Sequence, residues 1–212
     1  MSTTAPATPR SVSVSGLVKR YGDTTALAGL DLDVSGGEIL GIVGPNGAGK
    51  STFVKILAGD EVATSGEIHV NGQDWRRGVD ADRIAVVHQE PQLFPNLTVA
   101  ENLVVGREIS TFGWGKLRDL DKKVLSDTGL LPYMNRTLGD LSISLQQRTE
   151  IARALVRSAD VFLFDEPNSA LTEDESEQLF AYMHSLADAG SVVILVTHRL
   201  AELVRHADRA VV

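Results

Sequence analysis

The stretch GPNGAGKST, from Gly44 to Thr52, holds the residues of this chain best suited to grip a polyphosphate. It matches the pattern G-x-x-x-x-G-K-[ST], in which small residues let successive backbone N–H groups turn toward phosphate oxygens. The apolar segment EILGIV precedes it and the helical pattern STFVKILAG follows it, so a helix N-terminus adds positive potential. We expect Lys50 to reach the β and γ phosphates of a nucleotide and Ser51 to hold Mg²⁺. The expected phosphate-binding residues are Gly44, Pro45, Asn46, Gly47, Ala48, Gly49, Lys50, Ser51 and Thr52.

Two carboxylates, Asp165 and Glu166, end a second apolar segment, VFLFDEP. In a chain with a phosphate-binding loop, an Asp at the end of a strand is expected in the Mg²⁺ shell. Glu166 is then placed to orient or deprotonate the attacking water, as a catalytic residue together with Lys50. The chain has no NKxD sequence to read guanine, which disfavours a GTPase. A small-molecule P-loop kinase remains an alternative on these residues alone.

The segments that must position these residues alternate between strands and helices, as in a parallel sheet with crossover helices. In such sheets ligands gather at the carboxyl ends of the strands, so we expect the site there. Near-continuous apolar runs predict strands buried on both faces at 38–44, 83–89, 161–167 and 191–198.

Two further regions differ from this core. Period-two alternation predicts an antiparallel sheet from 11–18, 26–34 and 66–70. Residues 98–157 show helical patterns, broken around 113–115 and 130–133, and predict a helical subdomain inserted between two core strands.

Composition and charge exclude several classes of protein. The 212 residues contain no Cys, so neither a disulfide framework nor a thiolate metal site is possible. The net charge of −8 disfavours a broad nucleic-acid footprint, and we expect no nucleic-acid partner. The longest apolar runs fall short of the roughly 20 residues that span a bilayer. Residues 1–10 predict a disordered tail before a domain at 11–212, and the strand-like end ADRAVV suggests that the polypeptide continues.

Five motifs in order give the chain a resemblance to the nucleotide-binding subunit of an ATP-binding cassette (ABC) transporter, from about residue 11 to 212. They are GPNGAGKST, HQEPQLFPNLTVAENLVVGRE, LSISLQQRTEIARAL, VFLFDEPNSALT and VTHRLAELVRHADR. Three features resemble those of one branch of the family, the bacterial importers for sugars and related small solutes. They are the second motif, the LS followed by two non-Gly residues, and the SALT after DEP. The resemblance implies an ATPase that uses ATP and Mg²⁺. Its fold would be α/β, with a RecA-like P-loop NTPase core, an N-terminal antiparallel β subdomain and an inserted α-helical subdomain.

The resemblance also implies roles for single residues. Tyr21 would stack on adenine, Gln89 would complete the Mg²⁺ shell and sense the γ-phosphate, and His198 would donate to that phosphate. A loop of Ser169, Ala170 and Leu171 would cross to a partner cassette. The metal ligands would be Ser51, Gln89 and Asp165.

LSISLQQR, residues 141–148, stands where such proteins usually have LSGGQQQR. This turn is implied to contact the nucleotide of the partner cassette through Ser142, Ile143, Ser144, Leu145 and Gln146. Ser144 followed by Gln147 predicts a capping box. A helical face of Leu145, Thr149, Ala152, Leu155 and Val156 makes Leu145 the expected first core contact. Because Leu145 replaces a polar Gln, we expect it to weaken turnover.

The implied partners are a second cassette in a head-to-tail homodimer or tandem chain, transmembrane permease subunits, and indirectly an extracytoplasmic solute-binding protein. The segment EPQLFPNLTVAENL would contact the permease, at the cytoplasmic face of the cell membrane. The alternatives are a soluble cassette ATPase acting on nucleic acid or ribosomes, or a transporter for another class of solute. The first is disfavoured because Gln89 and Leu141 are separated without sustained heptads.

Overall fold

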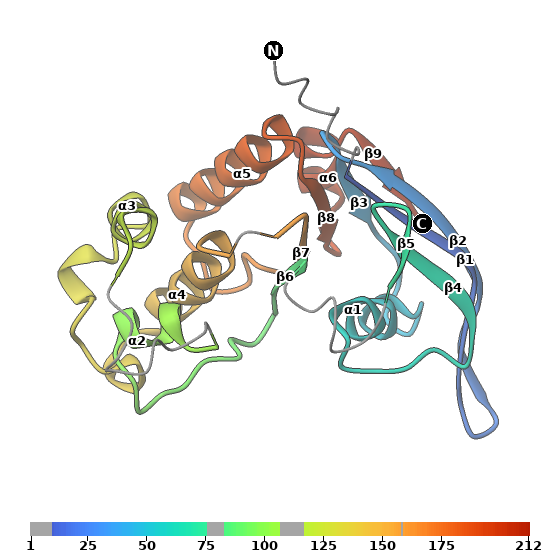
Figure 1. The fold of residues 1–212 in the computed structure, drawn as a ribbon, viewed down its shortest axis with the longest axis horizontal. Coiled ribbons are helices and arrows are strands. Elements are labelled where there is room, and N and C mark those ends of the chain that lie inside the picture. The colour runs from blue at the N-terminus through green and yellow to red at the C-terminus, as the bar shows by residue number, and fades with distance from the viewer. Residues whose placement is uncertain (1–9, 76–82, 107–116, 158) are drawn as a thin grey trace, which may run out of the picture. The chain divides into compact units, whose positions relative to one another are not determined.

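The computed structural model describes residues 10–75, 83–106, 117–157 and 159–212, drawn as a ribbon in Figure 1. The chain divides into two compact units. The first is built from Met1–Val86, Ala159–Glu166 and Glu177–Val212, and the second from Val87–Ser158 and Pro167–Ser176. Most of the expected tail lies outside the described residues. Arg10 belongs to the first unit, where its Nε lies 3.0 Å from Asp160 Oδ1.

A four-stranded antiparallel sheet forms from the alternating segments at the N-terminus. Its strands are β1 (Ser11–Tyr21), β2 (Thr24–Ser35), β4 (Ser65–Val70) and the short β5 (Gln73–Asp74), in the order β2-β1-β4-β5. Alternate residues of β1, such as Val12 and Val14, are buried, while their neighbours are partly exposed. The three predicted antiparallel strands are therefore confirmed, and β5 is an addition.

A second sheet supplies the core of the first unit. It comprises β3 (Ile39–Ile42), β6 (Ile84–Val87), β7 (Val161–Asp165), β8 (Val192–Val196) and β9 (Arg209–Val211), in the order β6-β7-β8-β3-β9. β8 runs parallel to β3 and β7, and all five of its residues are buried. Val196 is in register with both Ile42 and Asp165, so the carboxyl ends of three strands meet at one edge. The four predicted core strands are confirmed, each shorter than its apolar run.

The helices of the first unit follow these strands. α1 (Lys50–Ala58) follows β3 and buries Phe53, Val54, Ile56 and Leu57 in the core that includes Leu40 and Ile194. α6 (Leu200–His206) follows β8. The long helix α5 (Glu173–Asp188) begins in the second unit and continues in the first.

The second unit is helical in its described part. Its elements are α2 (Val99–Val104), α3 (Asp119–Asp127), α4 (Ile143–Leu155) and two short 3₁₀ helices, Leu131–Tyr133 and Leu138–Asp140. Leu103, Leu125, Leu130 and Ala152 belong to its apolar core. The predicted break at 130–133 is confirmed by the end of α3 and the 3₁₀ helix, whereas the break at 113–115 lies outside the described residues. Within the described ranges, no helix has the length and apolar character needed to cross a membrane.

Candidate functional site

The loop between β3 and α1 is shaped by glycine backbone. Gly47 and Gly49 have φ angles of 85° and 91°, which favour glycine. A Cβ on Gly49 would also lie 2.5 Å from the carbonyl oxygen of Ala26. Gly49 is the N-cap of α1 and contributes no side-chain cap. The first backbone N–H groups of α1 are therefore not capped by a side chain of Gly49. They lie at the N-terminal end of the helix, which favours anions.

Lys50 is the first residue of α1 and turns back over the loop. Its Nζ donates to the carbonyl oxygens of Gly44 at 2.7 Å and Pro45 at 3.0 Å. Ser51 is exposed and Thr52 half-buried on the same turn of the helix. An ammonium, a hydroxyl and the helix N-terminus thus lie at one end of α1, a combination suited to a polyphosphate.

Asp165 is the last residue of β7 and is half-buried. Burial raises the pKa of its carboxyl, the neighbouring Glu166 raises it further, and Lys50 and Lys55 lower it. The ammonium of Lys50 therefore acts electrostatically on Asp165. Together, Asp165 and the Ser51 hydroxyl offer the oxygen donors that Mg²⁺ prefers. In the described ranges, no three or more His, Cys, Asp or Glu residues are grouped to hold a metal by themselves.

Glu166 and His198 are joined at the same edge of the sheet. Glu166 Oε1 lies 3.1 Å from His198 Nδ1, and the backbone N–H of Glu166 donates to the carbonyl of Val196. The φ angle of Glu166 is 46°, a left-handed conformation that costs a non-glycine residue about 1–2 kcal/mol. Such strain gathers at functional sites. Asp165, Glu166 and His198 thus come together near the carboxyl edge, as the sequence predicts.

Tyr21 ends β1 in the same unit as the loop, and its side chain is exposed. Its hydroxyl donates to Glu61 Oε2 at 3.2 Å, and Lys19 Nζ lies 4.8 Å from the ring centroid. One face of the ring therefore carries a cation–π contact. Stacking of Tyr21 on adenine stays a prediction.

Other expected site residues belong to the second unit. Gln89 follows β6 and is exposed. The carbonyl of the preceding His88 accepts a hydrogen bond from Gln147 Nε2 at 3.2 Å. In the loop before α5, Ser169 is exposed, whereas Ala170 and Leu171 are half-buried. The N–H of Leu171 donates to the carbonyl of Asn168, which closes a turn.

The turn at the start of α4 differs from our prediction in one respect. The N-cap of α4 is Ser142, whose Oγ accepts from the N–H of Leu145 at 3.4 Å, so the predicted capping box of Ser144 and Gln147 is wrong. The helix begins two residues earlier than that box requires. Leu145 is half-buried against the apolar core, as expected, while Ile143 is exposed. Gln146 Nε2 donates to the carbonyl of Leu141.

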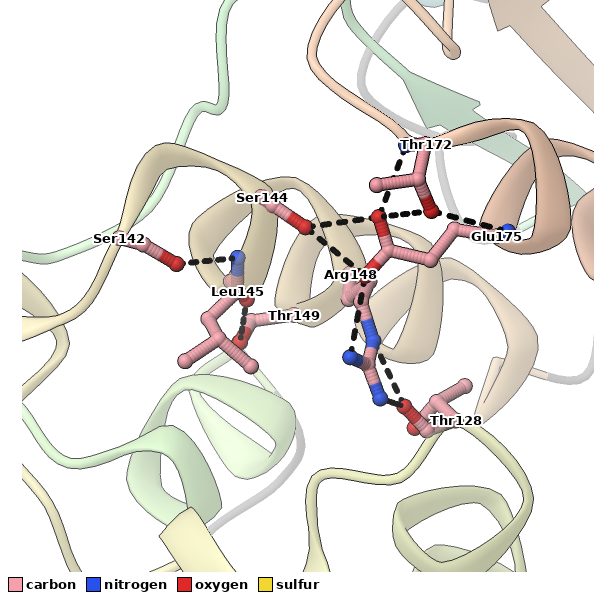
Figure 2. A network of polar contacts seen from close by, with 8 residues as sticks. All are labelled: Thr128, Ser142, Ser144, Leu145, Arg148, Thr149, Thr172 and Glu175. Atoms are coloured by element: carbon pink, nitrogen blue, oxygen red, sulfur yellow. Dashed lines mark hydrogen bonds and ion pairs between the residues drawn. The ribbon is translucent and has the colours of Figure 1, made fainter.

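A network of hydrogen bonds surrounds Glu175, which the sequence did not predict. Figure 2 shows Ser144 and Arg148 of α4 pointing toward Glu175 in the first turn of α5. Glu175 also forms a reciprocal cap with Thr172, because each backbone N–H donates to the side chain of the other. The pattern T-x-x-E at 172–175 is a capping-box signature and was the available signal for this end of α5. No local pattern indicated the bonds from α4.

Glu150 is a second residue that we did not predict. It is buried on α4, and burial raises its pKa to about 7 against the lowering effects of Arg153 and of the backbone of Gln92 and His88. Its Oε2, with Gln147 Oε1 and Arg153 Nε, has no hydrogen-bond partner among the described residues. α4 therefore buries a polar cluster beside residues 88–92.

Comparisons with known proteins agree with these motifs. The family model described as ABC transporter matches residues 27–169. A ribose import ATP-binding protein of Yersinia pestis is 40% identical over 200 residues, which cover 91% of this chain and 39% of that protein. An arabinose import ATP-binding protein of Burkholderia cenocepacia is 41% identical over 197 residues, which cover 90% of this chain and 39% of that protein. The chain thus spans about two fifths of the length of these relatives.

Solved structures show the same fold. An ATP-binding cassette of an ABC transporter in its ADP conformation matches with a TM-score of 0.79 and 26% identity, covering 94% of this chain and 85% of that one. A bacterial exporter of the Atm1 family with ATP bound matches with a TM-score of 0.80 and 28% identity, covering 92% of this chain and 36% of that one.

Proposed function

We propose that this chain, which belongs to the ABC transporter family, binds and hydrolyses ATP. The hydrolysis would drive import of a sugar or related small solute. The observation that carries the proposal is the arrangement of the first unit. There the parallel strands β3, β7 and β8 end at one edge of the sheet. At or after these strand ends lie the glycine loop with Lys50, then Asp165, and the Glu166–His198 pair. Such an edge is where α/β sheets bind nucleotides.

Residues of the loop hold the phosphates. The backbone N–H groups of residues 44–52 other than Pro45, and the ammonium of Lys50, now bonded to the carbonyls of Gly44 and Pro45, turn to the β and γ phosphates. Ser51 and Asp165 would hold Mg²⁺, with Gln89 as a further proposed ligand. Bound there, Mg²⁺ would supply positive charge to the phosphates and would favour the ionised form of Asp165, whose pKa is raised by burial.

Glu166 orients or deprotonates the attacking water, and His198 donates to the γ-phosphate. The 3.1 Å contact between Glu166 and His198 supports this pairing, since it fixes the two side chains in reach of one another. Catalysis of this kind depends mostly on positioning and on charge stabilisation. Tyr21 stacks on the adenine.

A second cassette completes the site. In a head-to-tail dimer, the turn 142–146 closes over the nucleotide of the partner, and the loop 169–171 crosses the interface. The exposed Ile143 and Ser142 at the N-terminus of α4 support this role, because a helix N-terminus favours an anion.

Transport needs transmembrane permease subunits, and segment 90–103 contacts them at the cytoplasmic face of the membrane. Hydrogen bonds from one buried side chain fix the backbone of this segment. Asn102, fully buried, accepts from the N–H of Phe94 and donates to the carbonyls of Phe94 and Thr98. Phe94 itself is exposed. The names of the relatives, for ribose and arabinose import, support a sugar as the solute and, indirectly, an extracytoplasmic solute-binding protein.

Glu166→Gln tests the proposal. The change keeps the size of the side chain and removes the base, so we expect ATP hydrolysis to fall by about 100-fold or more. ATP and Mg²⁺ should still bind and should hold the variant as a dimer, measured by light scattering after gel filtration. Glu177→Gln, which removes the ion pair of α5 with Arg205, is the matched control and should behave as the wild type. A Glu166→Gln protein that stays monomeric with ATP, or hydrolyses it normally, would contradict this function.

A further inference from the structure

The carboxylate of Glu175 joins α4 to the first turn of α5 within the second unit (Figure 2). Ser144 Oγ donates to both of its oxygens, at 2.9 and 3.0 Å. Arg148 Nη1 lies 3.2 Å from Oε1. On the other side, the N–H and the hydroxyl of Thr172 donate to Oε2 at 3.0 and 3.1 Å. One side chain thus accepts hydrogen bonds from two separate segments.

The charge of Glu175 is supported by these contacts. Burial raises its pKa, but the Thr172 N–H, the hydroxyls of Ser144 and Thr172 and the charge of Arg148 lower it, with a net decrease. The side chains of Glu175 and Arg148 are only 20% and 21% exposed. A partly buried, charge-assisted pair of this kind is stronger than an exposed one.

The two ends of the network lie within or next to segments of the proposed nucleotide site. Ser144 is the second residue of α4 and follows the N-cap Ser142. Thr172 directly follows Leu171, the last residue of the 169–171 loop. Arg148 extends the network, since its Nε donates to the carbonyl of Thr128 at the end of α3 at 2.8 Å. The hydroxyl of Ser144 is directed to Glu175, which leaves its backbone N–H as the group offered to a nucleotide.

We propose that Glu175 is a positioning residue that holds the turn 142–146 and the loop 169–171 in one fixed arrangement, so that both present themselves together to the partner cassette. We define the Glu175 brace as Ser144, Arg148, Thr172 and Glu175. This inference rests on the proposed function, because it assigns the two segments to the composite site. The side chains of the brace act through other residues and do not touch the nucleotide, to which Ser144 offers only its backbone N–H.

Amide hydrogen exchange, measured on the isolated chain, tests the brace independently of ATPase activity. In Ser144→Ala the hydrogen bonds from the Ser144 hydroxyl are lost, while the Arg148 contact and the Thr172–Glu175 cap remain, so the fold should be kept. We expect the amides of residues 168–171 to exchange about threefold faster, and about tenfold faster when Arg148→Met is added. Ser144→Thr keeps a hydroxyl and should restore slow exchange. Glu177→Gln removes another Glu–Arg pair of the same helix, that with Arg205, and should leave these amides unchanged.

Steady-state kinetics on the complete transporter tests the consequence. We expect Ser144→Ala with Arg148→Met to lower kcat about tenfold and to leave KM for ATP nearly unchanged, because the loop 44–52 is intact. Unchanged exchange overturns the brace, and so does unchanged kcat in a variant whose exchange has accelerated. A wild-type protein that does not hydrolyse ATP refutes the proposed function instead, and the exchange experiment then still decides whether the brace exists.

Discussion

The N-termini of α1 and α4 are built in opposite ways. α1 begins after Gly49, which supplies no side-chain cap, and its buried residues are all apolar. α4 begins after Ser142, whose hydroxyl caps the helix, and its buried residues include Gln147, Thr149 and Glu150. The first helix start is shaped by backbone conformation and packing, and the second by side-chain hydrogen bonds.

This difference bears on what each helix can do. A helix start without a side-chain cap leaves its N–H groups to an anion, and glycine allows the preceding loop to approach it. At the start of α4, Ser142 caps the helix itself, but Ser144 and Arg148 depend on partners elsewhere in the chain, at the end of α3 and in α5. We infer that the loop before α1 can bind phosphate by itself, whereas the turn before α4 must first be positioned.

The largest effect should come from Lys50→Ala. Lys50 supplies the only side-chain cation of the loop 44–52, so its loss should reduce ATP turnover about 100- to 1000-fold and weaken ATP binding. Fluorescent nucleotide titration and phosphate release measure the two effects. Lys55→Ala, one turn and a half further along α1 and exposed, is the control and should retain activity. Equal losses in both variants would contradict a specific role for the start of α1.

The polar interior of α4 predicts an unusual pH dependence. The pKa of Glu150 is about 7 when folded, against about 4.5 when unfolded, so its contribution to stability is fully present below pH 4.5 and is lost as pH rises through 7. A difference of this size corresponds to about 3 kcal/mol in the free energy of unfolding. Glu150→Gln should abolish this loss and be more stable than the wild type at pH 8, measured by chemical unfolding.

Glu101 gives the opposite sign and serves as the control. The backbone N–H and hydroxyl of Thr98 lower its pKa, so its contribution is present above the unfolded value and is lost as pH falls. Glu101→Gln should therefore lose stability at neutral pH and approach the wild type in acid. A Glu150→Gln protein with the wild-type pH profile would show that α4 tolerates its buried carboxylate without cost.

The same contrast explains which features the sequence predicted. The loop before α1 was predicted because its glycines and Lys50 are consecutive, and the core strands because burial on both faces leaves unbroken apolar runs. The cap of α4 was placed two residues too late, because Ser142 and Ser144 are both acceptable caps and local sequence does not choose between them. The contacts of Ser144 and Arg148 with Glu175 depend on tertiary packing, and the spacing of residues along the chain does not predict them. The left-handed φ of Glu166 likewise has no signal in DEP.

Gly49→Ala tests whether backbone geometry defines the start of α1. Alanine would combine a φ of 91° with a Cβ placed 2.5 Å from the Ala26 oxygen, so we expect a loss of about 2 kcal/mol or more in unfolding free energy. Gly47→Ala is the matched control, because its φ is 85° but nothing lies within 4 Å of the added Cβ, and it should lose about 1 kcal/mol. Equal losses would mean that conformation alone, and not the close approach of β2, requires glycine at Gly49.

Leu145→Gln should have the smallest effect and addresses α4 directly. Leu145 packs half-buried against the core of the second unit, so glutamine there should lower the unfolding free energy by about 1 kcal/mol. The same change restores a polar group at the composite site, and one added hydrogen bond should raise ATPase activity of the complete transporter about threefold. Leu155→Gln, which also packs against that core, should lose stability without a gain in rate. If the rate of Leu145→Gln does not rise, Leu145 serves only the packing of α4, and the departure from the usual glutamine has no catalytic consequence.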